Sequence, residues 1–447
     1  MAYSPHTDAD RQRMLAAIGV ASVEELFADI PSSVRASRFE LPPPLVEQET
    51  RAELSRLAAL NHIPRLSFLG AGAYRHLVPQ VVWEVIGRSE FATSYTPYQP
   101  EVSQGTLQSI YEFQSLICEL TGMEVATASH YDGATATAEA ALMACRLTRR
   151  HRIAISTAVH PQVRRALATY CSGLGVEIVE VAADLADGGS GLTPVEAAAG
   201  ALGDDVACLV AQQPNFFGGI EPMAELADAA HAAGAQLVAF VEPVSLALLQ
   251  APATYGADLV AAEGQPLGIP LSYGGPYVGL MAAPMSAVRQ MPGRLVGATL
   301  DGEGRRGYVL TLQAREQHIR RERAASNICT NQALCALAAT AYLSAVGPAG
   351  LREVAELSTI QARHLAAAIE SGGCGERRFS APYFSEVALR VANAARRYAV
   401  LAERGIVAGY PLGRDYPELA DTLLLAATEL TTDDDIERLV DALGETA

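Results

Sequence analysis

Three short apolar runs decide the fold class of this chain: VACLVA at 206–211, QLVAFV at 236–241 and DLVAA at 258–262. An Ala-rich stretch with helical spacing, at 223–233, lies between the first two runs. Similar runs occur at 152–156, 176–181 and 277–281, and a second helical stretch lies at 134–150. This alternation is the βαβ rhythm of a mostly parallel sheet buried on both faces. We therefore predict an α/β fold for the middle of the chain.

The flanking regions are more helical. Thr7 is placed to cap a helix at 8–18 that Gly19 would end, and Ser22 with Glu25 forms a capping-box pattern for a second short helix. Beyond residue 327 come helical stretches at 331–346, 351–371 and 433–443, with strand candidates at 385–391 and 422–426. These patterns predict three parts: an N-terminal helical segment (1–75), a large α/β domain (76–325) and a small α+β domain (326–447).

Lysine is absent from all 447 residues, and the 33 cationic side chains are all arginine. A compositional drift from lysine to arginine explains most of this at the surface. The absence still has a chemical consequence. A carbonyl cofactor such as pyridoxal phosphate is held by an uncharged amine as a Schiff base, and arginine is not deprotonated to supply one. The chain therefore cannot do Schiff-base chemistry through a side chain of its own.

Composition excludes several other classes of function. The net charge of −17, with dispersed arginines, argues against nucleic acid or an anionic membrane as a partner. The chain opens without an apolar stretch, and its longest apolar run, 333–346, is shorter than a membrane span. We expect no metal site, because the cysteines lack zinc spacing; Cys118, Cys145, Cys208 and Cys335 are expected in the core. A reduced, cytoplasmic protein is predicted.

Three loop segments carry most of the chemical information. The segment at 94–105, SYTPYQPEVSQG, concentrates hydroxyl and amide groups that suit a small polar ligand, or it is an ordinary loop ahead of a helix. The segment at 131–136, YDGATA, precedes a long helix whose free N–H groups could receive a phosphate. The segment at 264–276, GQPLGIPLSYGGP, follows a strand, where α/β proteins place binding loops, although a plain turn explains it equally well.

These loops, in this order, resemble the P-protein family of the glycine cleavage system, and in particular its N-terminal subunit. The segments that carry the resemblance are 3–7, 69–74, 95–105, 132–136, 268–276 and 312–321. The resemblance runs over essentially the whole chain. It implies an α/β fold of the aspartate-aminotransferase-like kind (fold type I), with a large domain built on a mostly parallel sheet.

The resemblance also implies that the cofactor pocket of this chain is degenerate. Active members of the family carry a lysine after a strand, within His-Lys-Thr and ahead of an Ile-Pro and a Gly-rich loop. Counting back from Ile269 and Pro270, the similar position holds Gln265, and an amide cannot form an imine. Where active relatives place an aspartate against the pyridine nitrogen, this chain has Glu242, whose longer side chain would be misplaced. No catalytic residue is therefore expected on this chain.

A partner is implied as well. A second subunit (glycine dehydrogenase subunit 2) would bind pyridoxal phosphate covalently, and the heterotetramer would decarboxylate glycine and transfer the aminomethyl group to the lipoyl group of H-protein. Loops of this chain would complete the partner's site and orient substrate and cofactor. The residues predicted to line that site in trans are Tyr95, Thr96, Tyr98, Gln99 and Gln104; further candidates are His76, Ser272, Gly274 and Gly275.

Two other hypotheses stay open at this point. A purely structural or regulatory pseudoenzyme would stabilise the partner without touching substrate. A self-sufficient enzyme would need a pyruvoyl-type cofactor, a metal or an activated cysteine, and no spacing in the sequence supports any of them. We interpret Cys329 as a core thiol at a domain junction and His318 as a member of an ion-pair network.

Overall fold

The computed structural model describes residues 5–36 and 41–446 and separates into two compact units, Met1–His62 and Ile63–Ala447. The first unit contains α1 (Asp8–Ile18) and α2 (Glu47–Ala58). The predicted first helix is confirmed: the Thr7 hydroxyl accepts a hydrogen bond from Asp10 N, and Gly19 ends the helix at a φ of 89°. Tyr3, which begins the first segment of the family resemblance, lies outside the described residues.

A second short helix forms near residue 22 as predicted, but without the predicted capping box. Val23–Phe27 is a 3-10 helix, and the Ser22 side chain makes no capping hydrogen bond with the backbone. The Glu25 carboxylate instead accepts a hydrogen bond from Ala21 N at 3.1 Å.

A seven-stranded sheet forms the centre of the second unit, with the strand order β2-β8-β7-β6-β5-β3-β4. The strands are β2 (Val125–Ala126), β3 (Arg152–Ser156), β4 (Glu177–Val181), β5 (Val206–Gln213), β6 (Gln236–Val241), β7 (Leu259–Glu263) and β8 (Gly279–Ala283). Neighbours from β4 to β7 pair in parallel, and β8 and β2 pair antiparallel at one end. The structure thus has the predicted mostly parallel α/β sheet.

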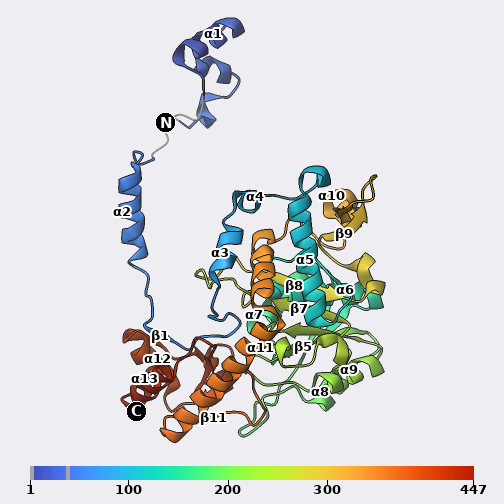
Figure 1. Ribbon diagram of the computed structural model, residues 1–447, viewed down its shortest axis with the longest axis vertical. Coiled ribbons are helices and arrows are strands. Elements are labelled where there is room, and N and C mark those ends of the chain that lie inside the picture. The colour runs from blue at the N-terminus through green and yellow to red at the C-terminus, as the bar shows by residue number, and fades with distance from the viewer. Residues whose placement is uncertain (1–4, 37–40, 447) are drawn as a thin grey trace. The chain divides into compact units, whose positions relative to one another are not determined.

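Alternate residues of each central strand enter two different cores, because successive side chains of a strand point to opposite faces. In β5, Leu209 packs into the first core and Val210 into the second. In β6, Leu237 and Val238 divide in the same way. Helices cover both faces (Figure 1), which explains why these strands read as continuous apolar runs.

Four helices alternate with strands of this sheet: α6 (Gly133–Thr148), α7 (Pro161–Cys171), α8 (Val195–Ala201) and α9 (Met223–Ala232). Three helices, α3 (Gln80–Ile86), α4 (Ser89–Ala92) and α5 (Gln104–Thr121), precede the sheet, and the short α10 (Gln317–Arg320) follows it. The helix α11 (Ala333–Ser371) is interrupted at Gly347, where φ is 60°, so it corresponds to the two predicted helices. By length and composition α11 is apolar enough to cross a membrane, but its first half packs into the first core, as a core helix does.

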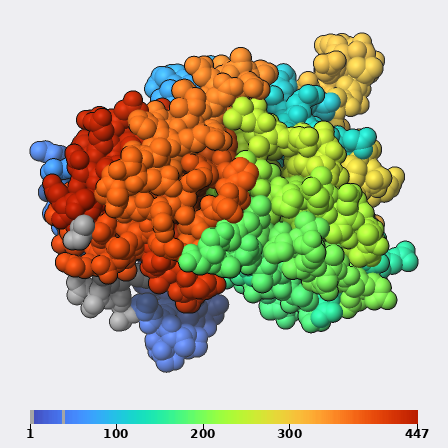
Figure 2. Space-filling view, turned by 90° about the horizontal axis from the view of Figure 1, so that it is seen from below, coloured from blue at the N-terminus to red at the C-terminus, as the bar shows by residue number. Residues whose placement is uncertain are grey.

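A second, four-stranded sheet lies in the C-terminal part, in the order β11-β12-β15-β14. Its elements are β11 (Glu376–Arg377), β12 (Glu386–Arg390), α12 (Ala394–Glu403), β14 (Tyr410–Pro411), β15 (Thr422–Ala426) and α13 (Asp433–Gly444). The short strand β1 (Leu66–Ser67) pairs with β13 (Ile406–Val407). An aromatic cluster that includes Phe216 and Tyr416 joins this part to the large sheet, and Figure 2 shows the orange and red segments against the green ones. The predicted division into three domains stays a prediction.

A hairpin and several cysteines differ from the sequence expectations. An antiparallel hairpin, β9 (Leu295–Leu300) with β10 (Arg306–Thr311), follows the large sheet and has no counterpart among the predicted strands. Cys329 is exposed, so its interpretation as a core thiol is wrong; the neighbouring Ile328 takes the buried position instead. Cys145 and Cys208 are buried as predicted, whereas Cys118 and Cys335 are only half-buried.

Candidate functional site

The carboxyl edge of the parallel sheet gathers the polar residues that the sequence singled out. The strands β5, β6 and β7 all end at this edge, and Glu242 and Gln265 follow the last two. Open α/β sheets bind ligands at such an edge. Here, however, side chains of the chain itself occupy the edge.

Gln265, which the resemblance predicted to stand in place of a lysine, is only 1% exposed and links one loop to another. Its Oε1 accepts a hydrogen bond from Tyr74 N at 2.7 Å, and its Nε2 donates to Tyr74 O at 2.9 Å and to Ile269 O at 2.8 Å. Both ends of the amide are therefore used within the chain. The Gln265 side chain therefore makes a structural contact between the Tyr74 loop and the loop that follows β7.

Glu263 occupies the N-terminus of α6, the place that sequence suggested for a phosphate. Its carboxylate accepts hydrogen bonds from Gly133 N at 2.9 Å, Gln265 N at 3.0 Å and Val278 N at 3.3 Å. Burial raises the pKa of Glu263 to about 7, although these backbone donors oppose the rise. A carboxyl group of the chain itself thus lies at this helix start, the kind of place where α/β proteins can bind an anion.

A second carboxyl group reaches the same region from the C-terminal sheet. Glu386 of β12 accepts hydrogen bonds from Ala71 N and from the Tyr74 hydroxyl, both at 2.7 Å. Burial raises the pKa of Glu386 to about 7, and burial together with this carboxyl group raises the pKa of Tyr74 well above its usual value. Tyr74 is thereby held from two sides, by Gln265 through its backbone and by Glu386 through its ring.

Glu242 and His160 also line the pocket at the sheet edge. The Glu242 carboxylate accepts hydrogen bonds from Val244 N at 3.1 Å and Ser245 N at 2.6 Å, so it caps the following turn. Burial raises the pKa of Glu242. The His160 ring lies edge-on to Phe216, with its Nε2 2.9 Å from Ala71 O, and burial lowers the pKa of His160. The neutral imidazole therefore donates to that carbonyl, since its Nδ1 accepts a bond from Gln162 N.

What is left of the pocket is a cavity of about 30 Å³. Its lining consists of Gly72, Tyr74, His160, Gln212, Phe240, Val241, Glu242, Pro243, Glu263 and Pro266. Such a volume holds about two water molecules, whereas small-molecule and cofactor sites measure roughly 300–1,000 Å³. The residues present therefore do not fit pyridoxal phosphate at this edge of the chain.

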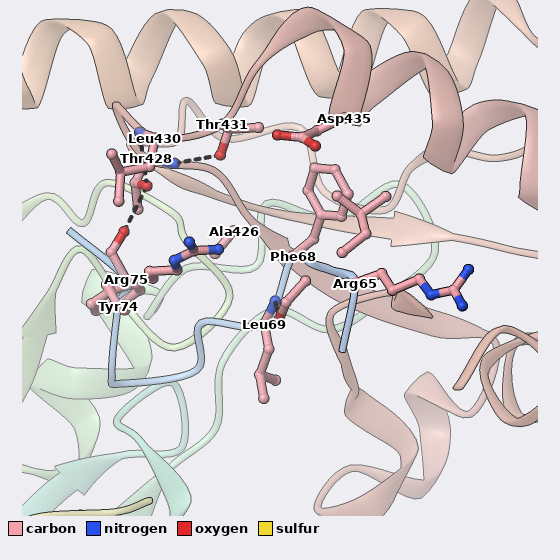
Figure 3. A pocket seen from close by; sticks show the side chains of 12 residues that line it. Arg65, Phe68, Leu69, Tyr74, Arg75, Ala426, Thr428, Leu430, Thr431 and Asp435 are labelled. Carbon is pink, nitrogen blue, oxygen red and sulfur yellow. Dashed lines mark hydrogen bonds between the residues drawn. The ribbon is translucent and has the colours of Figure 1, made fainter. Parts of the chain in front are cut away.

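A neighbouring groove of about 60 Å³ runs between residues 65–75 and 426–435 (Figure 3). The Thr428 hydroxyl donates to Arg75 O at 2.8 Å, and Thr428 N donates to the Thr431 hydroxyl at 3.0 Å. These bonds continue the attachment of the Tyr74 loop to the C-terminal sheet. We interpret the groove as the line of contact between the Tyr74 loop and the C-terminal sheet.

The predicted trans-lining residues do not line this cavity: Tyr95, Thr96, Tyr98 and Gln99 lie on the loop ahead of α5, and Gln104 is the first residue of that helix. The Tyr95 side chain is 73% exposed and that of Tyr98 is 46% exposed, and Gln99 is exposed as well. Thr96 is half-buried, and its hydroxyl has no hydrogen-bond partner among the residues that the structure describes. The loop thus presents two large aromatic side chains to the outside of the chain.

Gln104 fixes this loop to the hairpin β9–β10. Its Nε2 donates to Pro100 O at 2.7 Å and to Tyr308 O at 2.9 Å, and its Oε1 accepts from Tyr308 N at 2.9 Å. The amide is therefore engaged at both ends, so the structure gives Gln104 an anchoring contact instead of a free polar group.

The further candidates are placed in two different ways. His76 pairs with Glu429 of the C-terminal part: Nδ1 lies 2.7 Å from Glu429 Oε2, and Leu77 N donates to Oε1 of the same carboxylate. Burial raises the pKa of Glu429, but the hydrogen bond and charge of His76 outweigh burial and lower it overall. The turn at 272–275, with Ser272, Gly274 and Gly275, has four consecutive positive φ angles and lies largely at the surface.

Sequence reasoning missed Glu263, Glu386 and Arg294, all of which shape these sites. An acidic residue that ends an otherwise apolar strand was a usable signal for Glu263. Glu386 and Arg294 gave no such signal, because their partners Tyr74 and Tyr98 are 312 and 196 residues away in the sequence.

The fold and the filled site define a class: an α/β protein of fold type I whose sheet edge is occupied by its own side chains. The family follows from comparison, because residues 1–443 match the glycine cleavage system P-protein family. Proteins named probable glycine dehydrogenase (decarboxylating) subunit 1 from Moorella thermoacetica and Thermomicrobium roseum are 55% and 53% identical to it. The first alignment covers 99% of both chains, and the second covers 100% of this chain and 99% of the relative. The chain belongs to the glycine cleavage system P-protein family.

Solved structures agree with this assignment. A crystal structure of glycine decarboxylase (P-protein) of the glycine cleavage system, in inhibitor-bound form, is 44% identical, with a TM-score of 0.91 and full coverage of both chains. A sphingosine-1-phosphate lyase from Burkholderia pseudomallei, at 17% identity and a TM-score of 0.67, shares the fold alone. The predicted family and fold class are confirmed. The family and its fold relatives depend on pyridoxal phosphate.

Proposed function

We propose that this chain is the lysine-less subunit of a heteromeric glycine decarboxylase. With a second subunit that holds pyridoxal phosphate covalently, it decarboxylates glycine and passes the aminomethyl group to the lipoyl group of H-protein. Membership of the P-protein family supports the activity, and the name subunit 1 of its relatives supports the existence of a second subunit. The absence of lysine requires that the amine for the cofactor comes from that partner.

The observation that carries the proposal is a contrast within one chain. The pocket at the sheet edge is closed by Gln265 and Glu263, whereas the loop at 94–105 presents Tyr95 and Tyr98 at the surface. In the proposed complex these side chains form one wall of the partner's site. They orient glycine by hydrogen bonding and exclude water, and they do not act as nucleophiles.

A purely structural role is the alternative, and the relatives give it no support, since they are named as subunits of the dehydrogenase. The two roles differ in what they predict for the tyrosine hydroxyls. A structural partner needs the rings for packing but not the hydroxyl groups. An active-site wall needs both.

The test is the assembled complex with Tyr95→Phe or Tyr98→Phe in this chain. We expect at least one variant to decarboxylate glycine about tenfold more slowly, with assembly unchanged, because a positioned hydrogen bond in an active site contributes on that order. Tyr398→Phe, in α12 on the C-terminal part, is the matched control and should behave as the parent chain. Parent-like kinetics in both test variants would refute the wall and favour the structural role.

A second experiment tests where the cofactor is held. The purified chain, titrated with pyridoxal phosphate, should show no visible absorbance of bound cofactor and no glycine decarboxylation. Both should appear when the second subunit is added. Activity of the isolated chain would refute the proposal.

A further inference from the structure

We propose that Arg294 is a positioning residue that holds Tyr98 so that its phenol O–H serves an oxygen acceptor in the partner subunit's active site. The inference rests on the proposed function, because it assumes that the loop at 94–105 lines that site. It goes further in naming which tyrosine donates a hydrogen bond and which buried group directs it.

The first observation is the contact itself. Arg294 Nη2 donates to the Tyr98 hydroxyl oxygen at 2.9 Å, and the guanidinium carbon lies 5.3 Å from the centre of the Tyr98 ring. One cation therefore touches both the oxygen and the aromatic face. Together a charge-assisted hydrogen bond and a cation–π contact fix the side chain in one orientation.

The second observation is that Arg294 is itself held in place. It is 5% exposed and precedes β9, and its carbonyl accepts a hydrogen bond from Ala128 N at 2.9 Å. Its Nε lies 3.4 Å from Oε2 of Glu316, which is 8% exposed. His318 Nδ1 lies 3.7 Å from the same oxygen, and its ring meets the Tyr98 ring edge-on at 6.0 Å. Arg294 directly precedes β9 and Glu316 directly precedes α10, which contains His318; both elements are labelled in Figure 1.

The third observation concerns the small contribution of the buried Arg294–Glu316 pair to the stability of the fold. A buried Arg–Glu pair is a weak stabiliser, because desolvation of both charges consumes most of their attraction. Arg294 and Glu316 are nevertheless placed directly beneath a surface tyrosine. A pair that contributes little to folding and touches an exposed phenol is suited to directing that phenol.

The chemical consequence follows from the donor–acceptor inventory of tyrosine. Its oxygen accepts from the guanidinium, and no hydrogen bond donated by Tyr98 occurs within the part of the chain that the structure describes. The phenol proton is therefore available to an acceptor outside this chain, and the cation on the oxygen makes the O–H a stronger donor. A carboxylate or carbonyl oxygen of the bound substrate or cofactor is the class of acceptor that fits.

The test is a double-mutant cycle in the assembled complex. Arg294→Lys keeps the positive charge but loses the planar guanidinium group. We expect kcat to fall about tenfold relative to the parent complex, while the KM for glycine stays within about twofold of the parent value. In a Tyr98→Phe background, Arg294→Lys should lower kcat by a further factor of less than about two, because the hydroxyl that Arg294 directs is already gone. Arg378→Lys is the matched control: it alters a buried arginine that contacts Leu185 O and Ala186 O, and it should leave kinetics unchanged.

Each outcome of the double-mutant cycle either supports or overturns the role of Arg294. If Arg294→Lys slows the parent and the Tyr98→Phe complex by the same factor, Arg294 does not act through the hydroxyl and the inference is overturned while the proposed function stands. If Tyr98→Phe itself has parent kinetics, the assumption about this tyrosine fails first. Should Arg294→Lys prevent assembly, Glu316→Gln, which removes only the charge that holds Arg294, must show the same kcat pattern.

Discussion

A lysine introduced at position 265 should not lead to cofactor binding, and the reason follows from the contacts of Gln265. In Gln265→Lys, Tyr74 N loses the acceptor that it meets at 2.7 Å, and an unsatisfied buried donor costs about 1–3 kcal/mol. The ammonium group is also taken out of water at a position that is 1% exposed, and an incompletely paired buried charge costs several kcal/mol. We expect the free energy of unfolding to fall by about 4 kcal/mol.

The assay is urea unfolding of the isolated chain, followed by titration with pyridoxal phosphate. Because the cavity beside Gln265 measures about 30 Å³, no visible absorbance of bound cofactor should develop. Gln108→Lys, the same change at an exposed site in α5, should alter stability by less than about 0.5 kcal/mol. A Gln265→Lys chain with parent stability that binds the cofactor would refute the view that the pocket is closed.

Three other perturbations test neighbouring parts of the account. Glu386 has a pKa raised to about 7, so its burial destabilises the folded chain as pH rises from about 4.5 to about 7; Glu386→Gln should flatten that part of a stability–pH profile measured by chemical unfolding. Gly133→Ala would place a Cβ 2.7 Å from Glu263 N, and a loss of about 1–3 kcal/mol is expected in thermal unfolding, with no loss contradicting the tight approach. Gln104→Ala releases the loop from Tyr308 and should slow glycine decarboxylation severalfold without preventing assembly; unchanged rates would show that the anchor is dispensable.

The parts of the fold that were predictable share a strong local signal. The strand at 236–241 appears with the predicted bounds, because an apolar run buried on both faces can hardly be anything but a central strand. The hairpin of β9 and β10 was missed, since most of its residues are exposed or half-buried and lack that signal. Local pattern therefore identified the buried sheet and failed at the surface.

For the candidate site as well, local motifs could be read from the sequence and long-range contacts could not. The prediction that Gln265 stands in place of a lysine needed only a motif and a count, and it stays a prediction. What Gln265 does was not visible in the sequence, since its partner Tyr74 is 191 residues away. The role of Gln104 as an anchor and the Arg294 contact of Tyr98 are likewise long-range, and no spacing rule brings such residues together.

The central claim is that a second subunit supplies the amine and the cofactor, and that tyrosines of this chain complete its active site. A structure of the assembled complex with pyridoxal phosphate bound tests it most directly. The account predicts that Tyr95 or Tyr98 lies within about 4 Å of the coenzyme or a bound substrate analogue. A loop at 94–105 that lies remote from the coenzyme would contradict it.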